Sequence, residues 1–171
     1  MTRLPHALLA FVLLSAWAGA QNGAPPALTA EDKVRLFREN SALIESLVND
    51  GVALSAAETP VKRAEHSRSA ARALVNAIAQ AASAEDADRV VELAGLFRTV
   101  ARDAVVPALD DAKRVVTPES PDGKKLRELR EQAARDVSDV KAAAPPASKW
   151  SASPRVKDAL KALDEIANAL K

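Results

Sequence analysis

The apolar residues of this chain recur every three or four positions over most of its length, and this spacing constrains the fold more than any other feature. It places apolar side chains on one face of an α-helix, whereas a half-buried strand would need strict alternation. Alanine, the strongest helix former, accounts for 38 of the 171 residues, and aromatic residues for only 3%. We therefore expect an all-α fold, an antiparallel bundle of four to five helices.

Capping residues and prolines predict where the helices begin and end. The first is expected over 29–57, passing through Gly51, and the second begins at Pro60 after a Thr59 cap. A serine at position 83 is read as the cap of a third helix that runs to about residue 116 and is kinked at Pro107, because a proline deletes one backbone hydrogen bond. The last two helices are predicted over 124–144 and 153–171, with loops before each.

The first 20 residues have the order of a secretory signal peptide: a charged start with Arg3, an apolar run, and small residues up to Ala20. The apolar run of about 12 residues is shorter than the roughly 20 needed to cross a bilayer, so we expect cleavage and no stable membrane insertion. The expected organisation is a signal peptide over 1–20, a tether over 21–28 and one helical domain over 29–171. The expected location is the periplasm or the outside of the cell.

The composition argues against several classes of function. The chain has no cysteine and a net charge of +1, so it offers no thiolate chemistry and no electrostatic basis for binding nucleic acid. After the leader His66 is the only histidine, and the Glu-x-x-His spacing of di-iron bundles does not accompany it. No glycine-rich phosphate loop and no Gly-x-Ser-x-Gly motif occur. We therefore expect no catalytic, metal-binding or cofactor-binding residues, and a protein that is not an enzyme.

One stretch of the chain, between Leu36 and Glu92, carries a pattern of leucine, alanine and arginine with a few fixed polar positions. The residues that carry it are Asn40, Leu43, Ile44, Leu47, Val48, Gly51, Val52, Leu54, Ala56, Ala57, Glu58, Pro60, Arg63, Ala64, Asp86, Arg89 and Glu92. The pattern resembles a type of uncharacterised exported helical protein of high-GC bacteria. The resemblance implies an antiparallel helical pair and brings no known activity.

The leading functional hypothesis is a structural or protein-interaction module of the cell envelope, bound to an unknown protein partner or to a second copy of itself. Trp150 lies in a proline-containing loop next to Lys149. Either it fills the core between the last two helices, or it anchors a partner together with Lys149.

The alternative hypothesis is a periplasmic small-ligand binder or stress sensor. An apolar cavity at the Pro107 kink would be lined by Phe97, Val105, Val106 and Leu109. Because rings are scarce, such a ligand would contact mainly aliphatic side chains.

Overall fold

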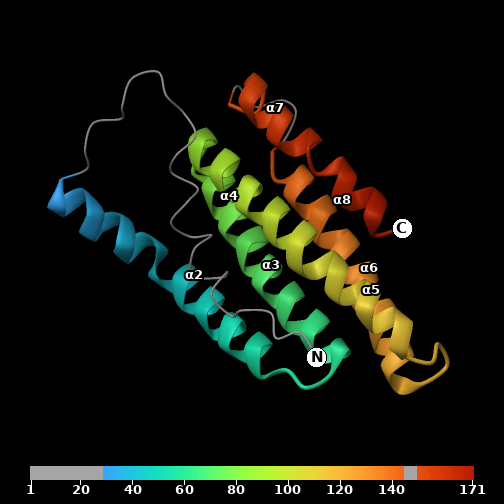
Figure 1. Cartoon of the computed structure of the whole chain (residues 1–171). Helices are drawn as coiled ribbons and strands as arrows, with labels where there is room; N and C mark the ends of the chain where they lie inside the picture. The colour runs from blue at the N-terminus through green and yellow to red at the C-terminus, as the bar shows by residue number, and fades with distance from the viewer. Residues whose placement is uncertain (1–28, 145–149) are drawn as a thin grey trace. The chain divides into compact units, whose positions relative to one another are not determined.

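The computed structural model describes residues 29–144 and 150–171, and every regular element in this part of the chain is helical (Figure 1). The elements are α2 (Ala30–Ala56), α3 (Pro60–Ser83), α4 (Ala87–Val100), a π-helical turn η1 (Ala101–Val105), α5 (Val106–Val115), α6 (Pro121–Ala142), α7 (Pro154–Lys161) and α8 (Asp164–Ala169). The predicted all-α class is confirmed. The expected signal peptide and tether, residues 1–28, lie outside the described residues.

Local sequence determines where these helices begin. The hydroxyl of Thr59 accepts a hydrogen bond from the Lys62 amide at 3.2 Å, and Pro60 occupies the first helical position of α3. Further along, α2 passes through Gly51 without a break, as predicted. The start of the second helix and the continuity of the first therefore follow from the sequence rules.

The start of α4 differs from the prediction. The N-cap is Asp86, whose carboxylate accepts from the Arg89 amide at 3.0 Å, and not Ser83. Ser83 is the last residue of α3, where its hydroxyl donates to the Ala79 carbonyl at 2.8 Å. The chain turns between the two helices at Glu85, which has a φ of 56°. Asp86 caps α4 because it lies directly after the turn at Glu85, whereas Ser83 lies before that turn and belongs to α3.

Helical backbone continues through Pro107, and the turn before it is a π-turn. The Val106 amide donates to the carbonyl of Ala101, five residues back, at the end of η1. Pro107 has no backbone N–H and cannot donate a helical hydrogen bond, and the π-turn widens the helix directly before it. The helix then ends at Val115, close to the predicted boundary.

The C-terminal segment, expected as one helix, is divided into α7 and α8. Ser153 and Pro154 begin α7 as predicted, but the backbone tightens at its end, where the Leu163 amide bonds the Leu160 carbonyl at 3.2 Å, three residues back. Leu163, at the end of this turn, and Ile166, in α8, are both buried.

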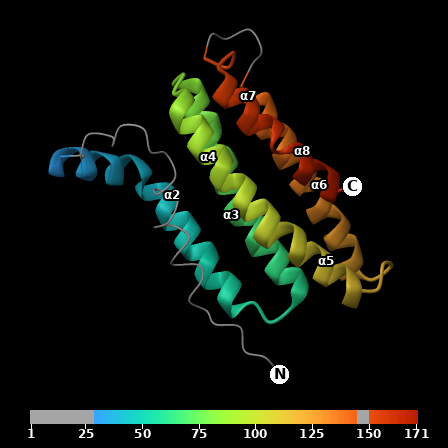
Figure 2. The ribbon, with the colours of Figure 1, turned by 45° about the horizontal axis from the view of Figure 1, so that its top comes forward.

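The chain divides into two compact units within α2, after Ser41. The described part of the first unit is the helical stretch 29–41, which exposes Val34 and Phe37. In the second unit α3 packs against α4, α5 and α6, while α7 contacts α4 and α8 contacts α6 (Figures 1 and 2). None of the described helices is long and apolar enough to span a membrane.

The core of the second unit follows the predicted apolar faces. In α3 the buried residues recur at helical spacing: Val61, Ala64, Ser67, Ala71, Leu74, Val75, Ile78 and Ala81. Several of them are small, which allows neighbouring helices to approach α3 closely. The larger side chains that fill the centre are Leu74 and Ile78 of α3, together with Phe97 and Leu93 from α4 and Leu109 from α5.

Candidate functional site

The residues predicted from the sequence as functional have different surroundings in the structure. Trp150 is half-buried and packs against the hydrophobic core of the second unit. Lys149 lies outside the described residues. The contact of Trp150 with the core matches the packing interpretation of this side chain, and its role as an anchor stays a prediction.

The four residues expected to line an apolar pocket lie in or against the packed interior. Phe97, Val105 and Leu109 are buried and Val106 is half-buried. Phe97 and Val105 border a void of about 10 Å³, which is the size of one water molecule. A ligand larger than water would therefore require these side chains to move.

A buried carboxylate joins α3 to α6. The side chain of Asp136 is 2% exposed and receives two hydrogen bonds from Arg68, from Nε at 2.9 Å and from Nη2 at 3.3 Å. Arg72, one turn further along α3, donates from Nη1 to Asp136 Oδ1 at 2.8 Å, the oxygen that also accepts from Arg68 Nη2. Three charge-assisted hydrogen bonds thus compensate the burial of this carboxylate.

Arg72 also binds a second carboxylate on α6. The same Nη1 donates to Asp139 Oδ2 at 2.6 Å, and Asp139 is half exposed. The hydrogen bond to Asp139 has the largest effect on the pKa of Arg72 and raises it above its ordinary value, and the hydrogen bond to Asp136 raises it further. The guanidinium therefore stays charged and is held between the two aspartates.

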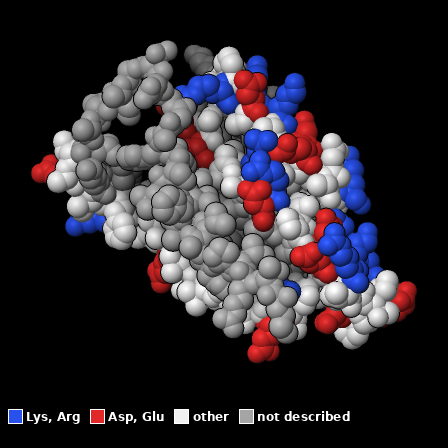
Figure 3. Space-filling model, in the orientation of Figure 1, with Lys and Arg blue, Asp and Glu red and all other residues white. Residues whose placement is uncertain are grey.

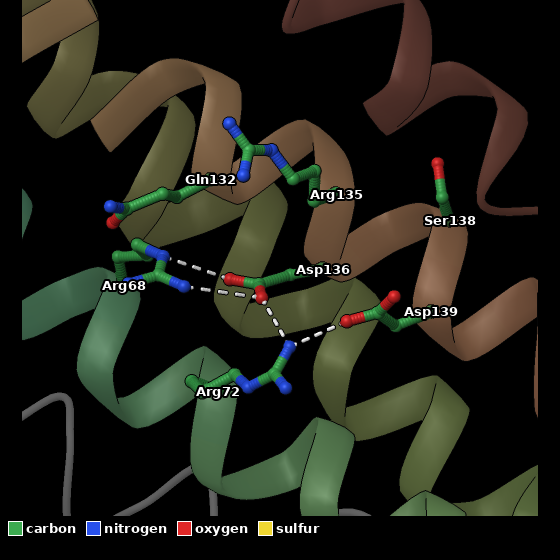
Figure 4. Close-up of a pocket in the computed structure, with 7 residues that line it drawn as sticks. All are labelled: Arg68, Arg72, Gln132, Arg135, Asp136, Ser138 and Asp139. Carbon is green, nitrogen blue, oxygen red and sulfur yellow. Dashed lines mark hydrogen bonds and ion pairs between the residues drawn. The ribbon is translucent and has the colours of Figure 1, made fainter. Parts of the chain in front are cut away.

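An open hollow of about 480 Å³ lies over this cluster (Figure 4). It is lined by Arg68, Arg72, Gln132, Arg135, Asp136, Ser138 and Asp139. In Figure 4 the side chain of Gln132 extends towards Arg68, and no dashed line joins Arg135 to Asp136. Three arginines and two aspartates give the lining a net charge of +1. We call these seven residues the arginine hollow.

A second feature is a set of exposed apolar side chains on the part of α2 that belongs to the second unit. Ile44 is 41% exposed, Val48 54% and Val52 64%. Their four-residue spacing places them on one face of the helix. Leu43 and Leu47, from the same segment, pack against the core. This stretch of α2 is therefore apolar on two faces.

Elsewhere on the described surface, charges of opposite sign lie next to each other, as the face in Figure 3 shows. Arg98 donates to Glu165 at 2.6 Å and Lys141 to Asp164 at 2.6 Å, and these hydrogen bonds lower the pKa of each acid. His66 is half-buried. Within residues 29–144 and 150–171, no three His, Asp or Glu side chains gather in a group that could hold a metal ion.

Sequence reasoning missed the arginine hollow, although one signal pointed to it. The apolar face of α6 contains Leu129, Ala133, Val137 and Val140, and Asp136 occupies a position three residues after Ala133 on the same face. A carboxylate in such a position needs a cationic partner. The partner, Arg68, lies 68 residues earlier, and only the packing of α3 against α6 reveals it.

No protein family, curated protein or solved structure matches this chain. Of what the sequence resemblance implied, the structure confirms the helical fold alone.

Proposed function

We propose that this chain is an exported, non-catalytic protein-interaction module of the cell envelope, folded as an antiparallel helical bundle and bound to its partner through α2. The proposal rests on one observation, the exposure of Ile44, Val48 and Val52 on a helix whose other face already contacts the core. In the described part of the second unit, Val115 is the other large apolar side chain with comparable exposure. A run of exposed apolar residues on one helix face is typical of an interaction surface.

The charges of this segment define the partner. Between Ala42 and Ala56 the chain contains Glu45 and Asp50 and no lysine or arginine. A complementary surface would present an apolar helix face flanked by basic side chains. We propose a separate protein with such a segment as the occupant, and the crosslinking experiment distinguishes it from a second copy of this chain.

Site-specific photocrosslinking tests the proposal. A benzophenone-bearing residue is introduced at position 48 of the full chain, and at position 115 in a matched control, because Val115 is exposed at the end of a different helix. We expect position 48, and not position 115, to crosslink to one envelope protein. Mass spectrometry should map the adduct to an apolar segment flanked by lysine or arginine.

Three results would contradict the proposal. Equal crosslinking from both positions would show non-specific contact. Crosslinks from position 48 to a second copy of the chain would replace the separate partner by self-association. The absence of any intermolecular crosslink, together with a monomeric mass by light scattering, would remove α2 as an interaction surface.

A further inference from the structure

We propose that the arginine hollow binds a ligand that carries a single carboxylate group. The hollow is lined by residues of α3 and α6 and includes none of α2, the helix proposed to bind the envelope partner. The buried side chain of Asp136 holds Arg68 and Arg72 in fixed positions on α3. Asp136 is a positioning residue, and the arginines are the groups that would contact the ligand.

The cationic groups are accessible although they are anchored. The side chains of Arg68 and Arg72 are 22% and 43% exposed, whereas Asp136 is 2% exposed. A guanidinium that is already oriented loses little conformational entropy when it binds an anion. Arg72 makes both of its ion pairs through Nη1, so its Nε and Nη2 are available as further donors.

Two more donor groups border the same hollow. Arg135 is 71% exposed and has a long contact of 3.4 Å to Glu131, which leaves most of its donors for other acceptors. Gln132 adds an amide group, and both side chains line the hollow (Figure 4). Arginine and amide donors around an open space suit an oxyanion.

The charge of the lining selects among oxyanions. The lining has a net charge of +1, and Glu131, which contacts Arg135 from outside the lining, reduces the local positive charge. A single carboxylate therefore suits the hollow better than a phosphate dianion, which would leave an excess negative charge beside Asp139 and Glu131. The hollow, at about 480 Å³, has room for a ligand larger than acetate. The carboxylate could belong to a small molecule or to a glutamate side chain of a peptide.

The test is a titration of the full chain with sodium acetate, followed by NMR of the arginine Nε–Hε signals. A peptide capped at both ends and containing one glutamate distinguishes a peptide source from a free one, and sodium phosphate at matched ionic strength tests the anion class. We expect saturable shifts for Arg72 and Arg135, with half-saturation at about 1–10 mM acetate. The signal of Arg114, which is exposed, paired with Asp111 and outside the hollow, should not saturate.

Three variants sharpen the test. Arg135→Gln should weaken acetate binding by about tenfold, because it removes a charged donor from a side chain that is mostly exposed. Asp139→Asn should strengthen binding, since the lining then carries a net charge of +2. Arg114→Gln is the matched control and should leave binding unchanged.

The proposal is overturned if no hollow arginine shows a saturable shift, or if Arg114 shifts equally. It is also overturned if phosphate saturates the site and acetate does not, or if Arg135→Gln binds acetate as the wild type does. Stronger binding of the capped peptide than of acetate would assign the carboxylate to a protein segment, and the reverse would assign it to a small molecule.

Discussion

Replacing each of two glycines with alanine should change stability in opposite directions. Gly95 lies within α4, and a Cβ built there meets no atom within 4 Å. Gly123 lies in the first turn of α6, and a Cβ there would overlap the carbonyl oxygens of Thr117 and Pro118 and come within 2.7 Å of the Pro118 carbonyl carbon. These are backbone atoms, which a side-chain rotation cannot move away.

The magnitudes follow from these surroundings. Gly95→Ala should stabilise the protein by about 1 kcal/mol, the difference in helix propensity between the two residues. Gly123→Ala gains the same propensity but should cost about 1–3 kcal/mol through overpacking. It also displaces the Gly123 amide from the Ser120 hydroxyl, which it bonds at 3.0 Å, and loss of this cap costs about 1 kcal/mol. We expect a net destabilisation of about 1–3 kcal/mol.

The assay is urea unfolding of both variants and the wild type, followed by circular dichroism at 222 nm. In a thermal scan, a change of 1 kcal/mol should shift Tm by about 2–4 °C for a chain of this size. Equal stabilisation by the two substitutions would refute the close approach of the 117–123 turn to the start of α6. Destabilisation by Gly95→Ala would refute the open surroundings of that position in α4.

The remaining predictions concern charge and packing. Asp136→Asn should destabilise the fold by about 2–3 kcal/mol in urea unfolding. This is less than the cost of breaking a fully buried ion pair, because the partly exposed arginine partners can regain water. Asp139→Asn should cost less than about 1 kcal/mol, because Asp139 is half exposed. Equal costs would contradict the difference in burial. The pKa values of Asp164 and Glu165 are lowered in the folded state from their ordinary values of 3.8 and 4.5. The stability that these acids contribute is therefore fully present above their ordinary pKa values, and it is lost as the pH falls through their folded-state pKa values. Thermal scans between pH 5 and pH 3 should show this loss, and less of it at high salt; an equal loss at both salt concentrations would argue against the ion pairs. Phe97→Ala should cost about 3–5 kcal/mol in urea, and a cost below 1 kcal/mol would mean that the core adjusts to fill the space.

The apolar spacing was sufficient to predict helices, because burying one face of a helix depends on a local period. It was less reliable at boundaries. Ser120 and Pro121 begin α6 in the same way that Thr59 and Pro60 begin α3, yet the prediction placed this helix start at residue 124, after the loop. The serine–proline signal was present and was outweighed by the surrounding turn residues. Boundaries depend on which of several neighbouring caps the chain uses.

The arginine hollow could not be predicted, because it depends on which helices become neighbours. Asp136 occupies a position on the apolar face of α6, which signals a buried acid, but nothing local identifies Arg68 and Arg72 as its partners. The exposed face of α2 was missed for a related reason. The periodicity predicts which residues share a face of the helix, but it does not determine whether Ile44 and Val48 are buried. Only the packing shows that they remain exposed.

The central claim is that the exposed apolar residues of α2 serve binding and not folding. Its most direct test is urea unfolding of a variant that combines Ile44→Gln, Val48→Gln and Val52→Gln. It is measured beside crosslinking to an envelope fraction from a probe at position 55 of α2, in chains with and without the three substitutions. At about 0.5 kcal/mol for each surface substitution, we expect the combined variant to change the free energy of unfolding by no more than about 1.5 kcal/mol, and the crosslinked product to disappear. A loss of several kcal/mol, or a crosslink that survives the three substitutions, would contradict the claim.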